Sequence, residues 1–515
     1  MEDKELKVTR KGQDTYTESG TEYVLPDYNT DVRKILYSEA SIRPGSKFMG
    51  EDEAEFSGQI AYKVIYSDSE NKITGTEFFS DYEIAVKPQG GGMENANCDT
   101  RVSQFAIRLL GPRKFSAKSS VGAQTRFTEK ANLTPNMWDK AEEGEIQTKI
   151  KNLKVRNSLS CGAEEREIAE SLGHLDGVTE DEVKILYYKA EPIIDESSIC
   201  ENGILLRGRI AVFCVIEIEG NAAYMLKKAV PFEETVPEDG VKKDMYIFPT
   251  LTVTSEKFLI NPDETGCEVV ANIIVEYSAR LEENETVSIV SDAFITSCPT
   301  ENSYSDFSYT ELLERVLHTS KCESSTPRSE LCEGTLREVV FVNSFPKIES
   351  VRLENKRAEI KGEIKYVGVT SEVNDDGSIS YSGLKFTAPF EENVNINCQT
   401  GDKTNAEVRI TVKETNAGMD TERVYFSTEF NLDVLVLDEK SERVVLECFG
   451  REKERYSGEK ATVKVYYPDS DEDAFSVARK FHVSISSLCE NNSISVSAIA
   501  DGGSCGRLPR KIIVF

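Results

Sequence analysis

The sequence predicts a mainly β protein: three tandem, antiparallel β-sandwich-like repeats, followed by a small α+β domain with strand–helix–helix–strand order. Three observations lead to this prediction. Short landmarks recur at two offsets along the 515 residues, apolar and polar side chains alternate over much of the chain, and this pattern changes near Arg455. We therefore expect repeats over 1–150, 151–303 and 304–454, and a separate domain over 455–515.

Two landmarks indicate the repeats. Residues 34–37 read KILY, residues 184–187 repeat this after an offset of 150, and residues 339–341 (VVF) resemble it after an offset of 304. The second landmark is a glycine that precedes an apolar β-like run at the same offsets, as Gly58, Gly208 and Gly362. A glycine inside a strand indicates either a bulge or a close backbone approach, and both remain open.

Alternating side chains predict strands in each repeat. Residues 55–66 place Phe56, Ile60, Tyr62 and Val64 near one face, which is typical of a half-buried strand. Residues 374–377 (NDDG) lie between two such runs and predict a hairpin turn.

Two further patterns concern the ends of strands. Helical spacing at 164–172 and 310–317 predicts brief helices at the joints. The runs VPFEE at 230–234 and APFEE at 388–392 predict a turn at a strand end, which explains their paired glutamates without acid–base chemistry.

The C-terminal domain has a different pattern. We expect a strand at 463–467, a helix at 474–481 with Asp473 as N-cap, and a strand at 510–515. Between them, Ser484 or Ser486 is suited to cap a second short helix that runs through 488–491.

These features resemble known families in an ordered combination. Residues 475–484, Leu488 and Asn491–Asn492 look like the helix–turn–helix part of a LysM domain. The upstream repeats resemble the SPOCS domain of spore-coat proteins, through YVLP at 23–26, the 32–36 run, the Phe56–Gly58 strand and the Pro-Phe-Glu-Glu runs. Together they resemble the SipL-like family of spore coat morphogenetic proteins over nearly the whole chain.

The resemblance implies a non-enzymatic structural adaptor of endospore formation. Proteins of this family act in the mother cell cytoplasm, at the forespore and spore coat surface. Their partners are the coat-basement morphogenetic ATPase, stage IV sporulation protein A, and other coat proteins. The LysM-like domain contributes to that contact.

The chain departs from an ordinary LysM domain at two loops. Residues 470–474 read SDEDA where Gly-Asp-Thr-Leu is usual, and residues 506–510 (GRLPR) have no Pro-Gly pair. Such loops form the glycan groove in the family, so the acidic loop disfavours glycan binding and favours protein recognition. A glycan-binding cell-wall protein remains the alternative function.

The candidate partner-binding residues lie on the two C-terminal helices and the turn between them. They are Phe475, Arg479, Lys480, His482, Val483, Ser484, Leu488, Asn491 and Asn492. Arg479 and Lys480 are the preferred direct contacts, whereas Phe475 and Leu488 are equally suited to the domain core.

Charge and composition exclude several function classes. The chain has 90 acidic and 61 basic residues, a net charge of −29, which disfavours nucleic-acid binding because phosphate contacts need clustered positive charge. No long apolar run predicts membrane insertion, and the acidic start, residues 1–5, predicts no secretory signal. We therefore expect a cytoplasmic protein whose 12 cysteines are mostly reduced, with Cys214 in the core.

No pattern predicts catalysis, a cofactor or a metal. His174, His318 and His482 are the three histidines, and none has a nucleophile or zinc motif beside it. Asp469, Asp471 and Asp473 match the first three positions of an EF-hand loop, but the glycine and the final glutamate of that loop are missing.

The single tryptophan, Trp138, permits two interpretations. It is suited to anchor a contact between repeats or to pack against its own repeat, and we favour its own repeat.

Overall fold

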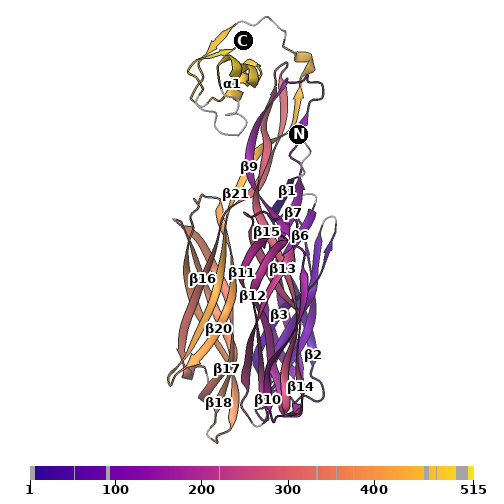
Figure 1. Cartoon of the computed structure of the whole chain (residues 1–515), viewed down its shortest axis with the longest axis vertical. Coiled ribbons are helices and arrows are strands. Elements are labelled where there is room, and N and C mark those ends of the chain that lie inside the picture. The colour runs from indigo at the N-terminus through magenta and orange to yellow at the C-terminus, as the bar shows by residue number, and fades with distance from the viewer. Residues whose placement is uncertain are drawn as a thin grey trace.

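The fold is mainly β, as predicted. The structure is a computed structural model that describes residues 6–50, 53–88, 93–219, 221–331, 334–354, 356–374, 376–456, 463–470, 472–494 and 508–514. Strands make up most of these residues, and the sheets are predominantly antiparallel. The strands run along the long axis of an elongated molecule, with the C-terminal region at one end (Figure 1).

The strands fall into three sets along the chain. The first set is β1 (Leu6–Lys11), β2 (Thr15–Val24), β3 (Lys34–Met49), β4 (Ala54–Ser67), β5 (Ile73–Val86), β6 (Met93–Gly111) and β7 (Lys114–Ala131). The second set is β9 (Ile146–Ser160), β10 (Glu164–Asp176), β11 (Val183–Cys200), β12 (Gly203–Ile218), β13 (Tyr224–Pro237), β14 (Tyr246–Pro262) and β15 (Gly266–Ile295). The third set is β16 (Thr300–Pro327), β17 (Thr335–Glu354), β18 (Arg357–Val373), β19 (Ile379–Asn395), β20 (Thr404–Met419) and β21 (Arg423–Gly450).

A few short elements lie outside the sets. They are β8 (Asn136–Met137), β22 (Lys464–Tyr466), α1 (Ala474–Phe481), α2 (Ile485–Asn491) and β23 (Ile512–Val514). Single 3-10 turns occur at Glu180–Glu182, Arg328–Glu330 and Glu452–Glu454.

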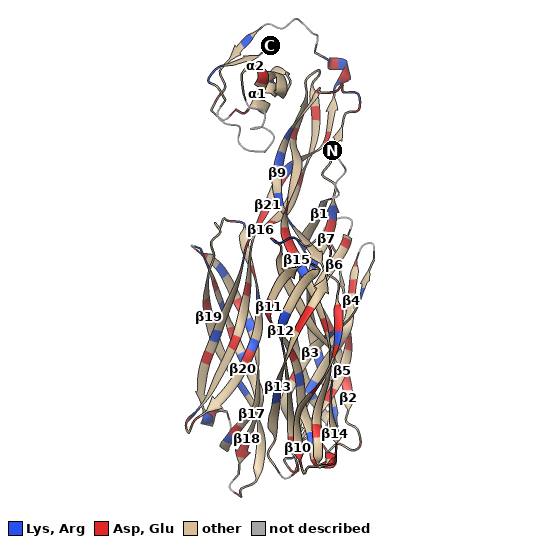
Figure 2. Cartoon of the chain, viewed as in Figure 1, with Lys and Arg blue, Asp and Glu red and all other residues tan. Residues whose placement is uncertain are grey.

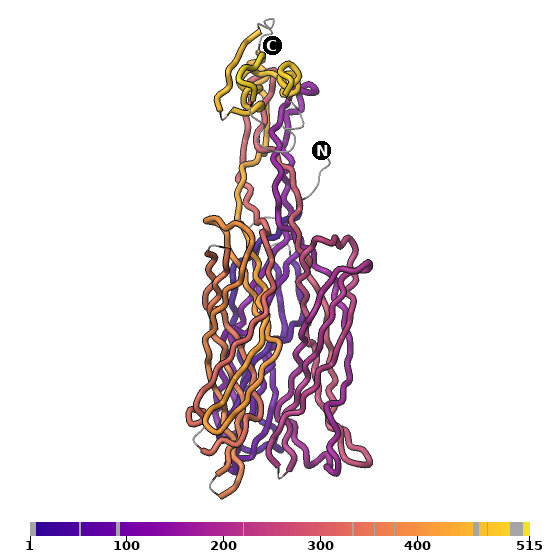
Figure 3. The backbone as a smooth tube through the Cα atoms, turned by 60° about the vertical axis from the view of Figure 1, so that its left-hand side comes forward, coloured from indigo at the N-terminus to yellow at the C-terminus, as the bar shows by residue number. Residues whose placement is uncertain are grey.

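Each set contains two sheets with the same order of strands. A three-stranded sheet is built as β3-β4-β5, β11-β12-β13 or β17-β18-β19. The other sheet has a central strand, which is β7 in the first set, β15 in the second and β21 in the third. On one side this strand pairs with β6, β14 or β20, respectively. On its other side it pairs with β1 and β2 in the first set, with β9 and β10 in the second, and with β16 in the third. Figure 3 shows the three sets as neighbouring bundles.

Each set has its own core between its two sheets. In the first set, Ile60 and Tyr62 of β4 pack in one cluster with Phe115 and Val121 of β7. Corresponding clusters join β12 to β15 and β18 to β21. Cys214 lies in the second of these cores, as predicted, and its burial raises the pKa of the thiol to about 12.

The three landmark glycines lie in matching surroundings. Each is paired with an aromatic residue of the next strand: Gly58 with Tyr82, Gly208 with Phe232, and Gly362 with Phe390. A Cβ at each glycine would come within 3 Å of that ring and of a backbone oxygen on the preceding strand. The preceding strand also has a bulge directly beside each glycine. Of the two interpretations left open by the sequence, close backbone approach is the one observed at the glycines, and the bulge lies on the neighbouring strand.

The predicted hairpin turn is confirmed. Asn374 and Gly377 lie between β18 and β19, and Gly377 has a φ of +81°, which favours glycine. The Gly377 amide donates to the Asn374 carbonyl, and the Asn374 amide donates to the Ser378 carbonyl, both at 2.9 Å.

Three local predictions are wrong. Residues 164–172 lie in β10 and residues 310–317 in β16, so neither stretch is helical. Both pair residue by residue with a long partner, β15 or β21, whose hydrogen bonds outweigh a weak helical preference. The Pro-Phe-Glu-Glu runs lie within β13 and β19 rather than at a turn, because Phe232 and Phe390 cover the glycines opposite them.

A narrow stalk rises from the three sets toward the C-terminal region (Figure 1). We define the stalk as β9, residues 280–295 of β15, residues 300–309 of β16 and residues 440–450 of β21. Arg280–Ile295 of β15 pair with β9, and the start of β16 pairs with the end of β21. Two small apolar clusters fill the stalk.

Trp138 lies in one of the stalk clusters. It packs with Ala293 and Ile295 of β15 and with Cys448 of β21, so it joins the second and third sets. The preference for packing within its own repeat is therefore wrong. The reason is that β8 leaves the first set and pairs with β21 in parallel.

Candidate interaction site

The C-terminal region has the predicted order of elements. β22, α1, α2 and β23 follow one another, and β22 pairs antiparallel with β23. Asp473 caps α1 by accepting a hydrogen bond from the Ser476 amide at 2.8 Å. Ser484, rather than Ser486, caps α2 by accepting from the Ser487 amide at 3.2 Å.

Phe475 and Leu488 belong to the core of this region. Phe475 is 4% exposed and Leu488 is 1% exposed. They pack with Val477, Ala478, Ile485, Cys489, Ile512 and Val514. Of the two roles that the sequence allowed for these residues, core packing is the one observed.

Several contacts attach the C-terminal region to the stalk. The ring of Phe475 meets the ring of Phe294 edge to face, with centroids 5.2 Å apart. Arg479 pairs with Asp292 at 2.5 Å, and Asp473 pairs with Lys149 at 2.5 Å. Finally, the amide of Ile485, at the start of α2, donates to Gln147 Oε1 at 2.9 Å.

Phe294 and its neighbours were not predicted as functional residues. Phe294 is buried among the side chains of α1 and α2, although it belongs to β15 of the second set. The only sequence signal for this contact is that Phe294 lies in an apolar run at the end of a strand. The face of α1 that carries Phe475 and Arg479 is therefore directed at the chain itself.

Three of the predicted contact residues are exposed. Lys480 Nζ lies 2.7 Å from the Tyr466 hydroxyl and 3.5 Å from Glu472 on the surface. His482 ends α1 in the left-handed conformation, with a φ of +55°. Its ring packs against Tyr456, and partial burial lowers the pKa of the imidazole. Asn491 is exposed at the end of α2.

The remaining three predicted residues are partly buried. Ser484 caps α2, and Val483 packs against the core of the region. The Asn492 side chain donates to the Ile513 carbonyl and accepts from the Ile513 amide, at 2.8 and 2.7 Å, which ties α2 to β23. Ser484 and Asn492 therefore have structural tasks, and Lys480, His482 and Asn491 form the accessible part of the predicted site.

The acidic loop before α1 also has structural partners. Glu472 accepts hydrogen bonds from the Tyr466 hydroxyl at 2.6 Å and from the Asp469 amide at 3.0 Å. Asp471, the middle residue of the EF-hand-like pattern, lies outside the described residues. Within the described ranges, no three His, Cys, Asp or Glu side chains are grouped so that they could hold a metal ion.

A second site, not predicted as functional, lies where the three strand sets meet. Tyr37, Tyr187 and Phe341 pack together with ring centroids 5.0 to 5.2 Å apart. We call these three residues the aromatic junction. Each follows a bulge at the same place in its strand, β3, β11 or β17. They come from the first sequence landmark, whose recurrence was visible without any indication that the copies touch.

Polar groups next to the aromatic junction form a buried network. The Tyr37 and Tyr187 hydroxyls both donate to the Glu39 carboxylate, and Lys189 pairs with that carboxylate at 2.9 Å. Asn343 Nδ2 donates to both hydroxyls at 2.8 Å. Glu39, Lys189 and Asn343 each lie two residues after a member of the aromatic junction.

These contacts determine the charge of Glu39. Burial alone would raise the pKa of this carboxyl, but Lys189, the Tyr187 hydroxyl and Lys63 outweigh burial and lower the pKa to about 2. Burial and the Glu39 charge raise the pKa of both tyrosines. Glu39 is therefore an ionised carboxylate, and the phenols of both tyrosines are neutral.

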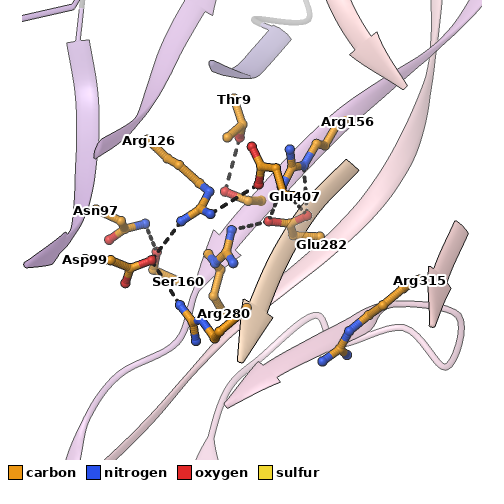
Figure 4. Close-up of polar contacts among 12 residues, drawn as sticks. Thr9, Asn97, Asp99, Arg126, Arg156, Ser160, Arg280, Glu282, Arg315 and Glu407 are labelled. Carbon is orange, nitrogen blue, oxygen red and sulfur yellow. Dashed lines mark hydrogen bonds and ion pairs between the residues drawn. The ribbon is translucent and has the colours of Figure 1, made fainter. Parts of the chain in front are cut away.

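An ion network at the base of the stalk also joins the sets (Figure 4). Arg126 of β7 lies 3.1 Å from Asp99 and 3.3 Å from Glu407 of β20. Arg409 of β20 lies 3.0 Å from Asp99. The network continues into the second set, where Arg156 of β9 forms a bidentate ion pair with the fully buried Glu282, with N–O distances of 2.8 and 2.9 Å.

His174 and His318, the histidines of the three sets, have acidic neighbours, and the Thr265 hydroxyl also lies 3.3 Å from His174 Nε2. His174 lies 2.9 Å from Asp176 and 2.8 Å from Asp263, and the hydrogen bond to Asp263 raises the pKa of the imidazole. The hydroxyl of Thr265 donates to Asp263. His318 lies 3.5 Å from Glu392. Figure 2 shows acidic and basic residues interspersed along the strands.

Comparisons with known proteins add no relative. No protein-family model, no curated protein and no solved structure matches this chain. Among the described residues, neither helix has the length and apolar character needed to cross a membrane. The ten described cysteines are free of disulfides.

Proposed function

We propose that this chain is a non-enzymatic structural adaptor in endospore formation, built from three copies of one β-sandwich unit and a C-terminal LysM-like domain. Its partner is the coat-basement morphogenetic ATPase, stage IV sporulation protein A, at the forespore surface in the mother cell cytoplasm. The sequence resemblance supplies this identity and this location. The geometry supports the mechanical part of the proposal.

Support for the triplicated unit comes from matched irregularities. A bulge precedes Tyr37, Tyr187 and Phe341 alike, and a second bulge lies beside Gly58, Gly208 and Gly362. Such details are not required by an antiparallel sheet in general, so their recurrence in three sheets favours copies of one ancestral unit.

One observation carries the adaptor function. The compact C-terminal region lies at the far end of the stalk, and the contacts of Phe475 and Arg479 with the stalk leave Lys480, His482 and Asn491 exposed to solvent. A binding surface at the tip of an extended, internally braced support is suited to hold one protein at a distance from another. We assign partner binding to these three exposed residues.

The test is capture of the purified ATPase by the immobilised full chain. Lys480→Glu combined with Asn491→Lys should reduce capture by at least about tenfold, because a reversed charge in a protein contact costs both attraction and fit. Lys257→Glu, on an exposed position of β14, is the matched control and should leave capture unchanged. Undiminished capture by the double variant would contradict the assignment.

The glycan alternative is separated by a different measurement. Purified peptidoglycan is pelleted with the full chain, and the adaptor proposal expects no saturable co-sedimentation. If the chain binds peptidoglycan saturably and the double variant Lys480→Glu, Asn491→Lys does not, the ligand of this surface is a glycan rather than a protein.

A further inference from the structure

The lower half of β6, residues 101–111, is a free sheet edge. In the part of the chain that the structure describes, β6 pairs with β7 alone, and its other side has no hydrogen-bonded strand. The upper half of β6 is occupied, since Asn97 contacts Ser160 of β9 and Asp99 contacts Arg409 of β20. Among the described residues, the lower half makes no hydrogen bond or ion pair with another strand set.

This edge lacks two of the features that normally protect edge strands, proline and acidic side chains. Residues 101–111 contain no proline and no acidic residue. They expose large apolar side chains, with Phe105 39%, Leu109 37% and Leu110 56% exposed. Natural sheets usually guard a free edge with charges, prolines or short strands, because unpaired backbone groups and apolar side chains recruit another strand. The edge can therefore accept a further strand by backbone pairing.

The two faces of this edge differ in chemistry. Phe105, Ile107 and Leu109 pair with β7 residues that are buried, so they lie on the inner face, where Ile107 packs against the core of the first set. Arg101 and Arg108 pair with Gly122 and Ser116, so they lie on the outer face. A bulge between Val102 and Gln104 brings the two arginines onto that same face, six pairing positions apart.

Both arginines are available for a partner. They are exposed, and neither forms an ion pair with a described residue. This is unusual in a chain whose acidic residues outnumber its basic ones by 90 to 61. Isologous pairing of β6 with β6 of a second copy would bring four arginines together, which like-charge repulsion disfavours. The charge on this edge instead complements an acidic strand.

We propose that the lower half of β6 binds an extended acidic segment of a partner protein by strand addition. In the bound state the segment pairs with the β6 backbone, its apolar residues continue the inner face, and its acidic residues, six positions apart, face Arg101 and Arg108. This site is separate from the C-terminal region and does not depend on the function proposed for it.

The test uses labelled peptides and the full chain. The probe is a fluorescein-labelled peptide of sequence SEVTVTVES, whose glutamates lie six positions apart on one face and whose valines lie on the other. The comparison peptide is SKVTVTVKS. Fluorescence anisotropy should show that the chain binds the glutamate peptide about tenfold more tightly, because two favourable cross-strand charge pairs become two repulsive ones in the lysine peptide.

A charge swap makes the test specific. Arg101→Glu with Arg108→Glu should reverse the preference, so that the variant binds the lysine peptide more tightly. A glutamate peptide N-methylated at alternate residues should not bind, because strand addition needs its backbone donors. Far-ultraviolet circular dichroism and the melting temperature verify that the double variant folds.

Three results would overturn the proposal. They are equal affinity for both peptides, a preference unchanged in the double variant, and binding of the N-methylated peptide as tight as that of the parent. A dimer of the chain that dissociates in Leu109→Asp, measured by analytical ultracentrifugation, would identify a second copy as the occupant instead.

Discussion

Tyr37 and Tyr187 lie edge to face with ring centroids 5.2 Å apart, although 150 residues separate them along the chain. Phe341 completes the aromatic junction by stacking on Tyr187 at 5.0 Å. The three strand sets are therefore joined at equivalent positions, and the association resembles that of a trimer built within one chain. This arrangement holds the three strand sets together.

Removing one ring of the aromatic junction should be costly. Tyr187→Ala leaves a cavity between the three sets and also removes a hydrogen bond to Glu39. We expect the free energy of unfolding to fall by about 3–5 kcal/mol. Urea denaturation measures this change, with Tyr16→Ala on the exposed face of β2 as a control of about 0.5 kcal/mol or less. Equal losses of unfolding free energy in the two variants would show that the aromatic junction contributes little to stability.

Lys189 should be as important as the rings. Lys189→Met removes the cation 2.9 Å from Glu39 and leaves a buried carboxylate without its main counter-charge. Such a change typically costs about 3–5 kcal/mol. Thermal and urea unfolding at pH 7 measure it, with Lys257→Met as the exposed control. A stability within about 1 kcal/mol of that of the unsubstituted chain would contradict the assigned role of the network.

The Glu39 network also predicts a dependence on pH. The pKa of Glu39 is about 2 in the folded chain and 4.5 ordinarily, so its contribution to stability is complete above about pH 4.5 and is lost as the pH falls toward 2. The difference in the free energy of unfolding between the unsubstituted chain and Glu39→Gln should therefore shrink over that interval. Urea titrations at several pH values measure this difference, and a difference that stays constant would exclude the predicted linkage.

The landmark glycines should tolerate no side chain. In Gly208→Ala the new Cβ would lie 2.1 Å from the Ile193 carbonyl oxygen and 2.9 Å from the Phe232 ring. We expect a loss of about 1–3 kcal/mol in the free energy of unfolding, because the neighbouring strand and ring must move apart. Gly418→Ala on β20 is a matched control, since nothing lies within 4 Å of its Cβ position. Similar melting temperatures for both variants would oppose this account.

The attachment of the C-terminal region can be loosened from the stalk side. Phe294→Ala combined with Asp292→Ala removes the ring and the carboxylate that hold Phe475 and Arg479. Hydrogen–deuterium exchange of α1 should become faster, while exchange in β4, within the first set, stays as before. Phe48→Ala, an exposed aromatic residue of β3, serves as control. Unchanged exchange in α1 would mean that the stalk contacts do not stabilise it.

Short-range signals in the sequence were sufficient for the local features. Asp473 was recognisable as a helix cap, and Gly377 as a turn residue, because each acts on backbone groups within a few positions. The second cap was narrowed to Ser484 or Ser486, and the structure shows Ser484. The repeated landmarks likewise needed only comparison of the chain with itself. The same reasoning failed at residues 164–172, whose helical spacing was overridden by pairing with β15, about a hundred residues away in the sequence.

The candidate site divides in the same way. The chain alone indicated that residues 474–491 form two capped helices, but it left the roles of Phe475 and Leu488 open. Those roles depended on what packs against the helices, and Phe294 comes from a strand nearly 180 residues earlier. Contacts between distant segments arise from the burial of apolar surface, which is non-directional and carries no local signature. For that reason the meeting of Tyr37, Tyr187 and Phe341 became visible only when the strand sets were assembled in space.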